Sequence, residues 1–130
     1  MTMPLWTGFL VVFLGSGIGG MLRHGVGLLA LRFTGANFPW GTLVINVVGS
    51  ALMGLMIGLF AARSINDPEL RLFVTTGLIG GFTTWSTFSL DIVTLWERGE
   101  IGSAIAYAAA SIVLSLTVLA IALLAARRWG

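Results

Sequence analysis

The chain has 130 residues, of which 57% are hydrophobic and only 9% are charged, and its mean hydropathy is +0.99. A soluble domain carries about 25% charged residues, so this composition indicates an integral membrane protein with little mass outside the bilayer. The seven basic residues are all arginines, too few for a nucleic-acid surface, and the lack of cysteine excludes disulfides and thiolate chemistry.

Apolar stretches long enough to cross a bilayer predict an all-α membrane protein, with a single domain over residues 1–130. The four predicted transmembrane helices cover residues 5–31, 40–62, 72–96 and 101–126. No basic residue precedes the first helix and no small-residue cleavage site interrupts it. We therefore expect this helix to remain in the mature protein.

The first span carries a charged residue well inside its apolar run. Gly15, Gly17, Gly19 and Gly20 are spaced to let another helix approach, and Arg23 follows them. Arg23 either extends its guanidinium to the membrane interface or faces an aqueous vestibule and attracts anions. We interpret the adjacent His24 as an interfacial residue without a chemical role.

The second span contains a single strongly polar residue, Asn46, between Val44–Ile45 and the small residues Gly49 and Gly54. An asparagine in a membrane helix commonly hydrogen-bonds a neighbouring helix. Alternatively, its amide group donates hydrogen bonds to a permeating ligand. The residues alone leave both interpretations open.

The third span is the most unusual part of the chain, because residues 75–91 read TTGLIGGFTTWSTFSLD. Two glycines, Gly80 and Gly81, precede a cluster of hydroxyl side chains through which Trp85 and Phe88 are threaded. So many polar residues at one depth are tolerated only where they face protein, water or an ion. We therefore predict a helix broken mid-membrane, with the break over residues 80–83, that lines an ion pathway.

The fourth span places Tyr107, Ser111 and Ser115 on one helical face, because they are spaced four residues apart. Serine often bonds back to its own helix and tyrosine often lies at an interface. Three such residues in register among apolar neighbours favour a polar track.

The arginines near the span ends divide weakly between the two membrane sides. One side has Arg63, Arg71, Arg127 and Arg128, and the other has Arg32 and Arg98, with Arg23 if it reaches that interface. A weak bias is typical of insertion in both orientations, although it also permits one fixed topology. Because the halves show no repeat, a symmetric pathway would need a second chain.

The polar groups within the spans are mostly hydrogen-bond donors, with Arg23 as the one charge expected at depth. This inventory suits a small anion. It argues against an enzyme, since no nucleophile–base pair or metal-ligand cluster is present. Two rival functions remain. One is a small proton-coupled exporter, which would need a mid-membrane carboxylate that this chain is not expected to have. The other is a non-conducting assembly protein, in which the glycines and Asn46 only pack helices.

The sequence resembles the Fluc/CrcB family of fluoride channels over essentially its whole length. The matching segments are GGMLRHG, GTLVINVVGS, GLIGGFTTWSTFS and the Tyr–Ser–Ser track. The resemblance implies a dual-topology antiparallel homodimer in the cell (inner) membrane that exports fluoride passively and reduces its toxicity. It also implies a structural sodium ion at the dimer centre.

The resemblance also implies roles for individual residues. Backbone carbonyls of Gly80 and Thr83 would hold the sodium ion, and Arg23 and Asp91 would line a vestibule. The implied fluoride pathway consists of Asn46, Trp85, Ser86, Thr87, Phe88, Tyr107, Ser111 and Ser115. The family's paired phenylalanines appear here as WSTF, so Trp85 replaces the first one and adds an indole N–H donor.

Overall fold

The computed structural model describes residues 2–130, so Met1, the first residue of the predicted domain, lies outside the described residues. Three long helices, α1 (Leu5–Thr34), α2 (Trp40–Ala62) and α6 (Ile101–Trp129), are continuous. The third span is divided into α3 (Pro68–Leu72), the π-helix η1 (Phe73–Ile79), α4 (Gly80–Phe82) and α5 (Trp85–Glu97). Residues 2–130 contain no strand, and the predicted four-helix, all-α architecture is confirmed.

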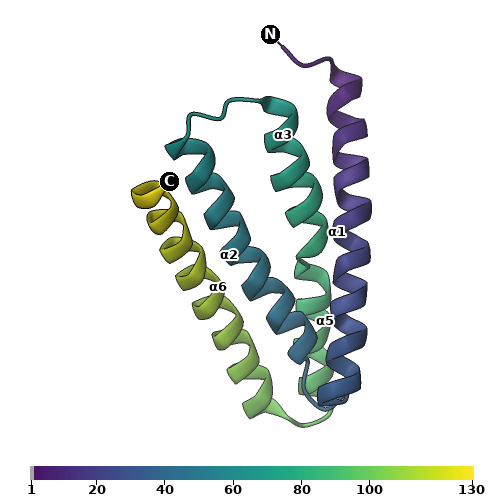
Figure 1. Cartoon of the computed structure of the whole chain (residues 1–130). Helices are drawn as coiled ribbons and strands as arrows, with labels where there is room; N and C mark the ends of the chain where they lie inside the picture. The colour runs from purple at the N-terminus through teal and green to yellow at the C-terminus, as the bar shows by residue number, and fades with distance from the viewer. Residues whose placement is uncertain (1) are drawn as a thin grey trace.

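The four spans run up and down, and both chain ends lie at the same end of the bundle (Figure 1). By length and hydropathy, α1, α2 and α6 are each able to cross a membrane. The third span is composed of shorter pieces. It begins at Pro68, before the predicted residue 72, because the Asp67 carboxylate accepts a hydrogen bond from Leu70 N at 3.0 Å and Pro68 suits the first helical turn.

Helix α1 packs closely on η1 and α4 through glycines spaced four residues apart on both partners. A Cβ atom added at Gly15 would lie 2.9 Å from Gly77 Cα, and one at Gly81 would lie 2.8 Å from Ser16 Cα. Gly19 meets the backbone of the same segment. Small residues let membrane helices approach until their backbones touch, which explains the glycine content of these two spans.

A second close pair is formed by α2 and α6. Gly54 faces the backbone of Leu119, and a Cβ atom at Gly58 would lie 2.6 Å from Ala126 Cβ. The α1–third-span pair and the α2–α6 pair are thus each fixed by glycines.

The break in the third span moves the chain from one helix pair to the other. Before the break, η1 and α4 pack on α1, and after it α5 packs on α6. Beyond the break, α2, α5 and α6 share a buried cluster of Leu43, Phe88, Leu95, Ala104 and Tyr107.

Candidate functional site

The helix is interrupted at Thr83 and Thr84, which both adopt extended backbone angles (φ/ψ −79°/161° and −152°/118°). The observed break overlaps the predicted residues 80–83 only at Thr83, because Gly80 and Gly81 remain helical. These glycines allow close packing instead. Helix α5 restarts at Trp85, and the Thr84 hydroxyl caps it by accepting a hydrogen bond from Thr87 N at 3.3 Å.

The side chain of Asn46 forms hydrogen bonds with the backbone at the break. Its Nδ2 donates to the carbonyl of Thr84 at 3.0 Å, and its Oδ1 accepts from Thr84 N at 2.8 Å. Both backbone groups of Thr84 are thus satisfied by α2 instead of by the third span. A backbone break at membrane depth requires such partners, because an unsatisfied N–H or C=O there costs several kcal/mol.

Arg23 reaches the same region from α1. Its Nε donates to the carbonyl of Gly81 at 3.2 Å, in the last turn before the break. Arg23 is half-buried, and its guanidinium contacts the third span. The positive charge lies at the carbonyl end of a helical segment, where a cation is stabilised.

Two carbonyl groups at the break are left without a partner. Within residues 2–130, no hydrogen bond reaches the carbonyl oxygen of Gly80 or that of Thr83. Thr84 N, the helical partner expected for Gly80, is bound to Asn46 instead. The same part of the chain has no cluster of three His, Cys, Asp or Glu side chains placed to hold a metal ion. Free carbonyl oxygens are the ligands available to a hard cation here.

Two cavities meet at the break. The first, here named the α1 cavity, has a volume of about 540 Å³ and lies between α1, the start of α2 and α5. The second, the α6 groove, has a volume of about 500 Å³ and lies between α2, the break and α6. Thr84 lines both of them, so the residue bound by Asn46 separates the two spaces.

The predicted site residues are distributed between these cavities. The α6 groove is lined by Asn46, Thr83, Trp85, Phe88, Ser111 and Ser115. The α1 cavity is lined by Arg23, Thr87 and Asp91. Ser86 is exposed, with its hydroxyl 3.5 Å from that of Thr84, and it lines neither of these cavities. Gly80 is exposed and also lies outside both linings.

The aromatic side chains form a continuous row. The rings of Trp85 and Phe88 have centroids 5.0 Å apart, and those of Phe88 and Tyr107 are 5.3 Å apart. Phe38 meets Tyr107 edge-on at 5.6 Å. Trp85 is 72% exposed, whereas Phe88 is only 4% exposed. The two aromatic positions of the WSTF motif are therefore in different environments.

Tyr107 is fully buried, and its hydroxyl donates to Asp91 Oδ2 at 2.8 Å. It links α6 to α5 and lines neither cavity, so it does not offer its hydroxyl to the α6 groove. Asp91 is half-buried in the α1 cavity. The Asp91 carboxylate is thus only partly open to solvent.

Ser111 is the polar side chain of the track that lacks an internal partner. It is 5% exposed, and its Oγ has no hydrogen-bond partner within residues 2–130. It lines the α6 groove with Ser115, one turn further along the same face. A buried hydroxyl without a protein partner is uncommon, and it is free to bond a water molecule or a ligand.

Sequence reasoning missed several residues that line the α1 cavity, including His24, Thr42, Thr94 and Arg98. His24, which was interpreted as having no chemical role, is exposed and belongs to this lining. The signal available for Thr94 and Arg98 was their spacing along α5, three residues from Asp91 to Thr94 and four from Thr94 to Arg98.

The family model described as CrcB-like protein, Camphor Resistance (CrcB), matches residues 10–123. This chain belongs to the CrcB family. A protein of Mesorhizobium japonicum named Fluoride-specific ion channel FluC is 51% identical over 118 residues, which cover 91% of this chain and 94% of that protein. The resemblance read from the motifs is thus confirmed.

Two further relatives with the same printed name show similar coverage. The protein of Granulibacter bethesdensis is 50% identical over 115 residues, covering 88% of this chain and 91% of the relative. The protein of Agrobacterium fabrum is 50% identical over 106 residues, covering 82% and 85% respectively. The similarity therefore extends through all four spans of this CrcB-family chain.

Proposed function

We propose that this chain forms a fluoride-selective channel that lets fluoride leave the cytoplasm passively and so reduces fluoride toxicity. The observation that carries the proposal is the junction at Thr84, where two cavities lined by amide, hydroxyl and guanidinium groups meet. The names of the relatives support the same function. As a multi-pass membrane protein, the chain would act in the cell (inner) membrane.

Conduction requires that hydrogen-bond donors replace the water bound to a small anion, while each site still releases it. Asn46 has two amide protons, and one of them is used by the Thr84 carbonyl at 3.0 Å. The second proton is available to an ion in the α6 groove. Asn46 would thus have both roles considered from the sequence, because it hydrogen-bonds a neighbouring segment and lines the path.

The remaining groove residues fit an anion path in different ways. Ser111 has an unpartnered hydroxyl at the groove wall, and Ser115 follows it. The rings of Phe88 and Trp85 border the same space, and aromatic edges carry partial positive charge. Tyr107 acts indirectly in this account, by holding Asp91 and supporting the ring of Phe88.

The driving force needs no energy source in the protein. Hydrogen fluoride crosses membranes as a neutral acid and dissociates inside, which traps fluoride as an anion. An inside-negative potential then favours exit by about 2.3 kcal/mol per charge per 100 mV. An open path selective for fluoride over the larger chloride is sufficient.

The functional unit we propose is an antiparallel homodimer of dual topology. Support comes from the surface of the single chain, on which Gly80 is exposed and Trp85 is 72% exposed beside the groove. A second copy would cover these residues. Counting fluorescently tagged subunits by photobleaching in liposomes tests the dimer, and single-step bleaching of active channels would contradict it.

We propose that a sodium ion has a structural role at the centre of this dimer. The unpartnered carbonyl oxygens of Gly80 and Thr83 suit such an ion, and the same two groups from a second chain would double the number of ligands. The ion would supply positive charge that offsets repulsion between anions and would join the two chains. Dimer stability that does not change when sodium is replaced by a larger organic cation would contradict this role.

One observation bears on the exporter alternative. Asp91 is half-buried and bonded to Tyr107, so the bundle does hold an enclosed carboxylate. A proton-coupled exporter would use such a group, whereas the proposed channel would not. Purified protein in liposomes should therefore pass fluoride in response to voltage, with no dependence on a pH gradient. Flux that requires the pH gradient would favour the exporter, and no flux would favour an assembly protein.

A further inference from the structure

One face of α5 carries a polar stripe that begins at the break and ends at the last turn. Its members are Thr84, Thr87, Asp91, Thr94 and Arg98, at intervals of three, four, three and four residues. Such spacing keeps side chains on one face of a helix. All five residues line the α1 cavity. With a rise of about 1.5 Å per residue, the stripe is about 21 Å long.

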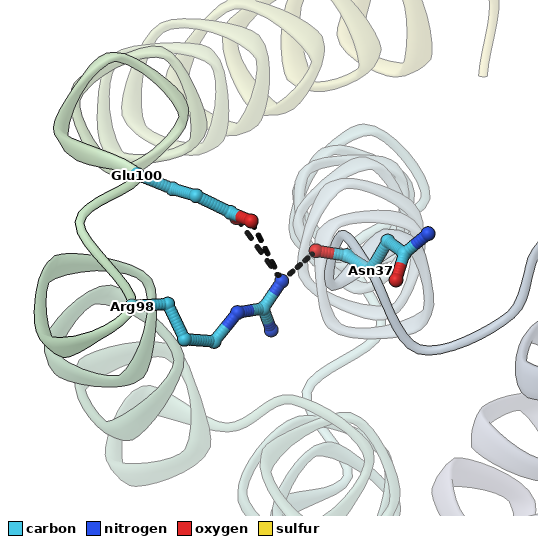
Figure 2. Close-up of polar contacts among 3 residues, drawn as sticks. All are labelled: Asn37, Arg98 and Glu100. Carbon is cyan, nitrogen blue, oxygen red and sulfur yellow. Dashed lines mark hydrogen bonds and ion pairs between the residues drawn. The ribbon is translucent and has the colours of Figure 1, made fainter.

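Arg98 occupies the open end of this stripe, where its side chain is 38% exposed. Its Nη2 atom donates to the carbonyl of Asn37 at 2.7 Å and to the Glu100 carboxylate at 3.0 and 3.2 Å (Figure 2). The guanidinium is thus held in one position by the loop before α2 and by the turn before α6. Its Nε and Nη1 atoms make no hydrogen bond to the described chain, which leaves donors for an anion.

The charged side chains around the α1 cavity differ in the hydrogen bonds that they already make. Arg23 is bonded to Gly81 beside the break, and Asp91 is bonded to Tyr107. His24 is exposed in the lining. Glu100 offsets Arg98, but this pair is exposed and its attraction is weakened by solvent. Arg23 and Arg98 both keep unused guanidinium donors, and Arg98 is the one at the open end of the stripe.

We propose that Arg98 recruits anions to the mouth of the α1 cavity and that Thr94 provides the next hydrogen-bond donor toward Thr87. This inference rests on the proposed function and extends the path beyond Asp91. Threonine hydroxyls and a fixed guanidinium suit a small hard anion such as fluoride. A positive charge at a channel entrance raises the local concentration of anions, and salt reduces this effect.

A purely structural role for Arg98 makes a different prediction. Through Asn37, Arg98 restrains the loop that carries Phe38, whose ring meets Tyr107 edge-on at 5.6 Å. Loss of this restraint would disturb the site equally at every salt concentration. Electrostatic recruitment instead depends on screening, since the Debye length falls from about 30 Å at 0.01 M to about 3 Å at 1 M ionic strength.

The test measures initial fluoride efflux from liposomes at fixed pH, at low and high concentrations of a salt whose anion does not permeate. We expect Arg98→Gln to slow efflux several-fold at about 0.01 M and to approach wild type at about 1 M. Arg98→Lys should keep most of the low-salt rate because the charge remains. Glu100→Gln should exceed wild type at low salt because the offsetting charge is lost. Thr94→Val should slow efflux at both salt concentrations, since it removes a donor without a charge.

An Arg98→Gln defect of equal size at both ionic strengths, or no defect at either, would overturn the role of Arg98. A wild-type rate for Thr94→Val would overturn the role of Thr94. If Arg98→Gln fails to fold, Glu100→Gln decides, and an unchanged low-salt rate for that variant would count against recruitment. Absence of fluoride flux in the wild-type protein would instead overturn the proposed function.

Discussion

The side chain of Asn46 on α2 makes two hydrogen bonds to the backbone of Thr84: Nδ2 donates to the Thr84 carbonyl at 3.0 Å, and Oδ1 accepts from Thr84 N at 2.8 Å. These bonds replace the partners that Thr84 would have in a continuous helix. This contact joins the second span to the interruption in the third. It determines where the helix stops, and it places Thr84 between the α1 cavity and the α6 groove. A single side chain thereby links the backbone break to the proposed anion path.

Replacing Asn46 with aspartate is expected to abolish fluoride efflux. The carboxylate removes the donor to the Thr84 carbonyl, places two acceptors together and introduces a negative charge that repels fluoride. The unsatisfied carbonyl adds a cost of about 1–3 kcal/mol. Liposome efflux measures the effect, and size-exclusion chromatography checks that the dimer still assembles. Wild-type-like efflux from Asn46→Asp would show that Asn46 does not line the path.

Replacing Trp85 with phenylalanine is expected to keep fluoride conduction. Trp85 is 72% exposed in the single chain, and phenylalanine retains the ring beside Phe88 while removing the indole N–H. Rates from single-channel recording or efflux should equal or exceed those of the wild type. Loss of flux in Trp85→Phe would mean that the indole itself is required and that the aromatic pair has been matched to the wrong positions.

Alanine substitutions at two glycines of α1 are expected to differ in their effect on stability, because Gly15 packs against η1 and Gly17 does not. A Cβ atom at Gly15 would lie 2.8 Å from the carbonyl oxygen of Phe73, whereas one at Gly17 meets nothing within 4 Å in the described chain. Gly15→Ala should therefore destabilise the fold by about 1–3 kcal/mol through overpacking. Thermal unfolding in detergent provides the comparison, with Gly17→Ala as the matched control. Equal melting temperatures for the two variants would contradict the close contact between α1 and η1.

Replacing Ser111 with alanine is expected to reduce efflux without reducing stability. The Ser111 Oγ has no partner within residues 2–130, so its removal breaks no internal hydrogen bond. The donor lost is one that we assign to the passing ion. Efflux should slow while the melting temperature stays unchanged or rises. A lower melting temperature combined with normal efflux would assign Ser111 a structural role instead.

The helical architecture was predictable because apolar stretches of sufficient length leave few alternatives in a membrane. The start of the third span at Pro68 was also readable, since Asp67 followed by proline is a recognised helix-start pattern, although the predicted span begins only at residue 72. Charged residues can occupy the first turn of a span when they lie outside its apolar part.

The position of the break could not be obtained from local sequence. Gly80 and Gly81 are weak helix formers, yet they stay helical because α1 packs against them. Thr83 and Thr84 leave the helix because Asn46, 38 residues before Thr84, supplies the replacement bonds. Likewise, the burial of Tyr107 against Asp91 depends on how α5 crosses α6. The spacing of Thr94 and Arg98 on the stripe is visible in the sequence, but their place in the α1 cavity depends on how α5 packs.

The central claim is tested most directly by fluoride and chloride efflux from the same preparation of liposomes containing the purified wild-type chain. Ion-selective electrodes would follow each anion after a potassium ionophore sets the membrane potential. We expect fluoride to leave rapidly and chloride to remain near the level of protein-free liposomes. Equal efflux of the two anions, or retention of both, would contradict a fluoride-selective channel.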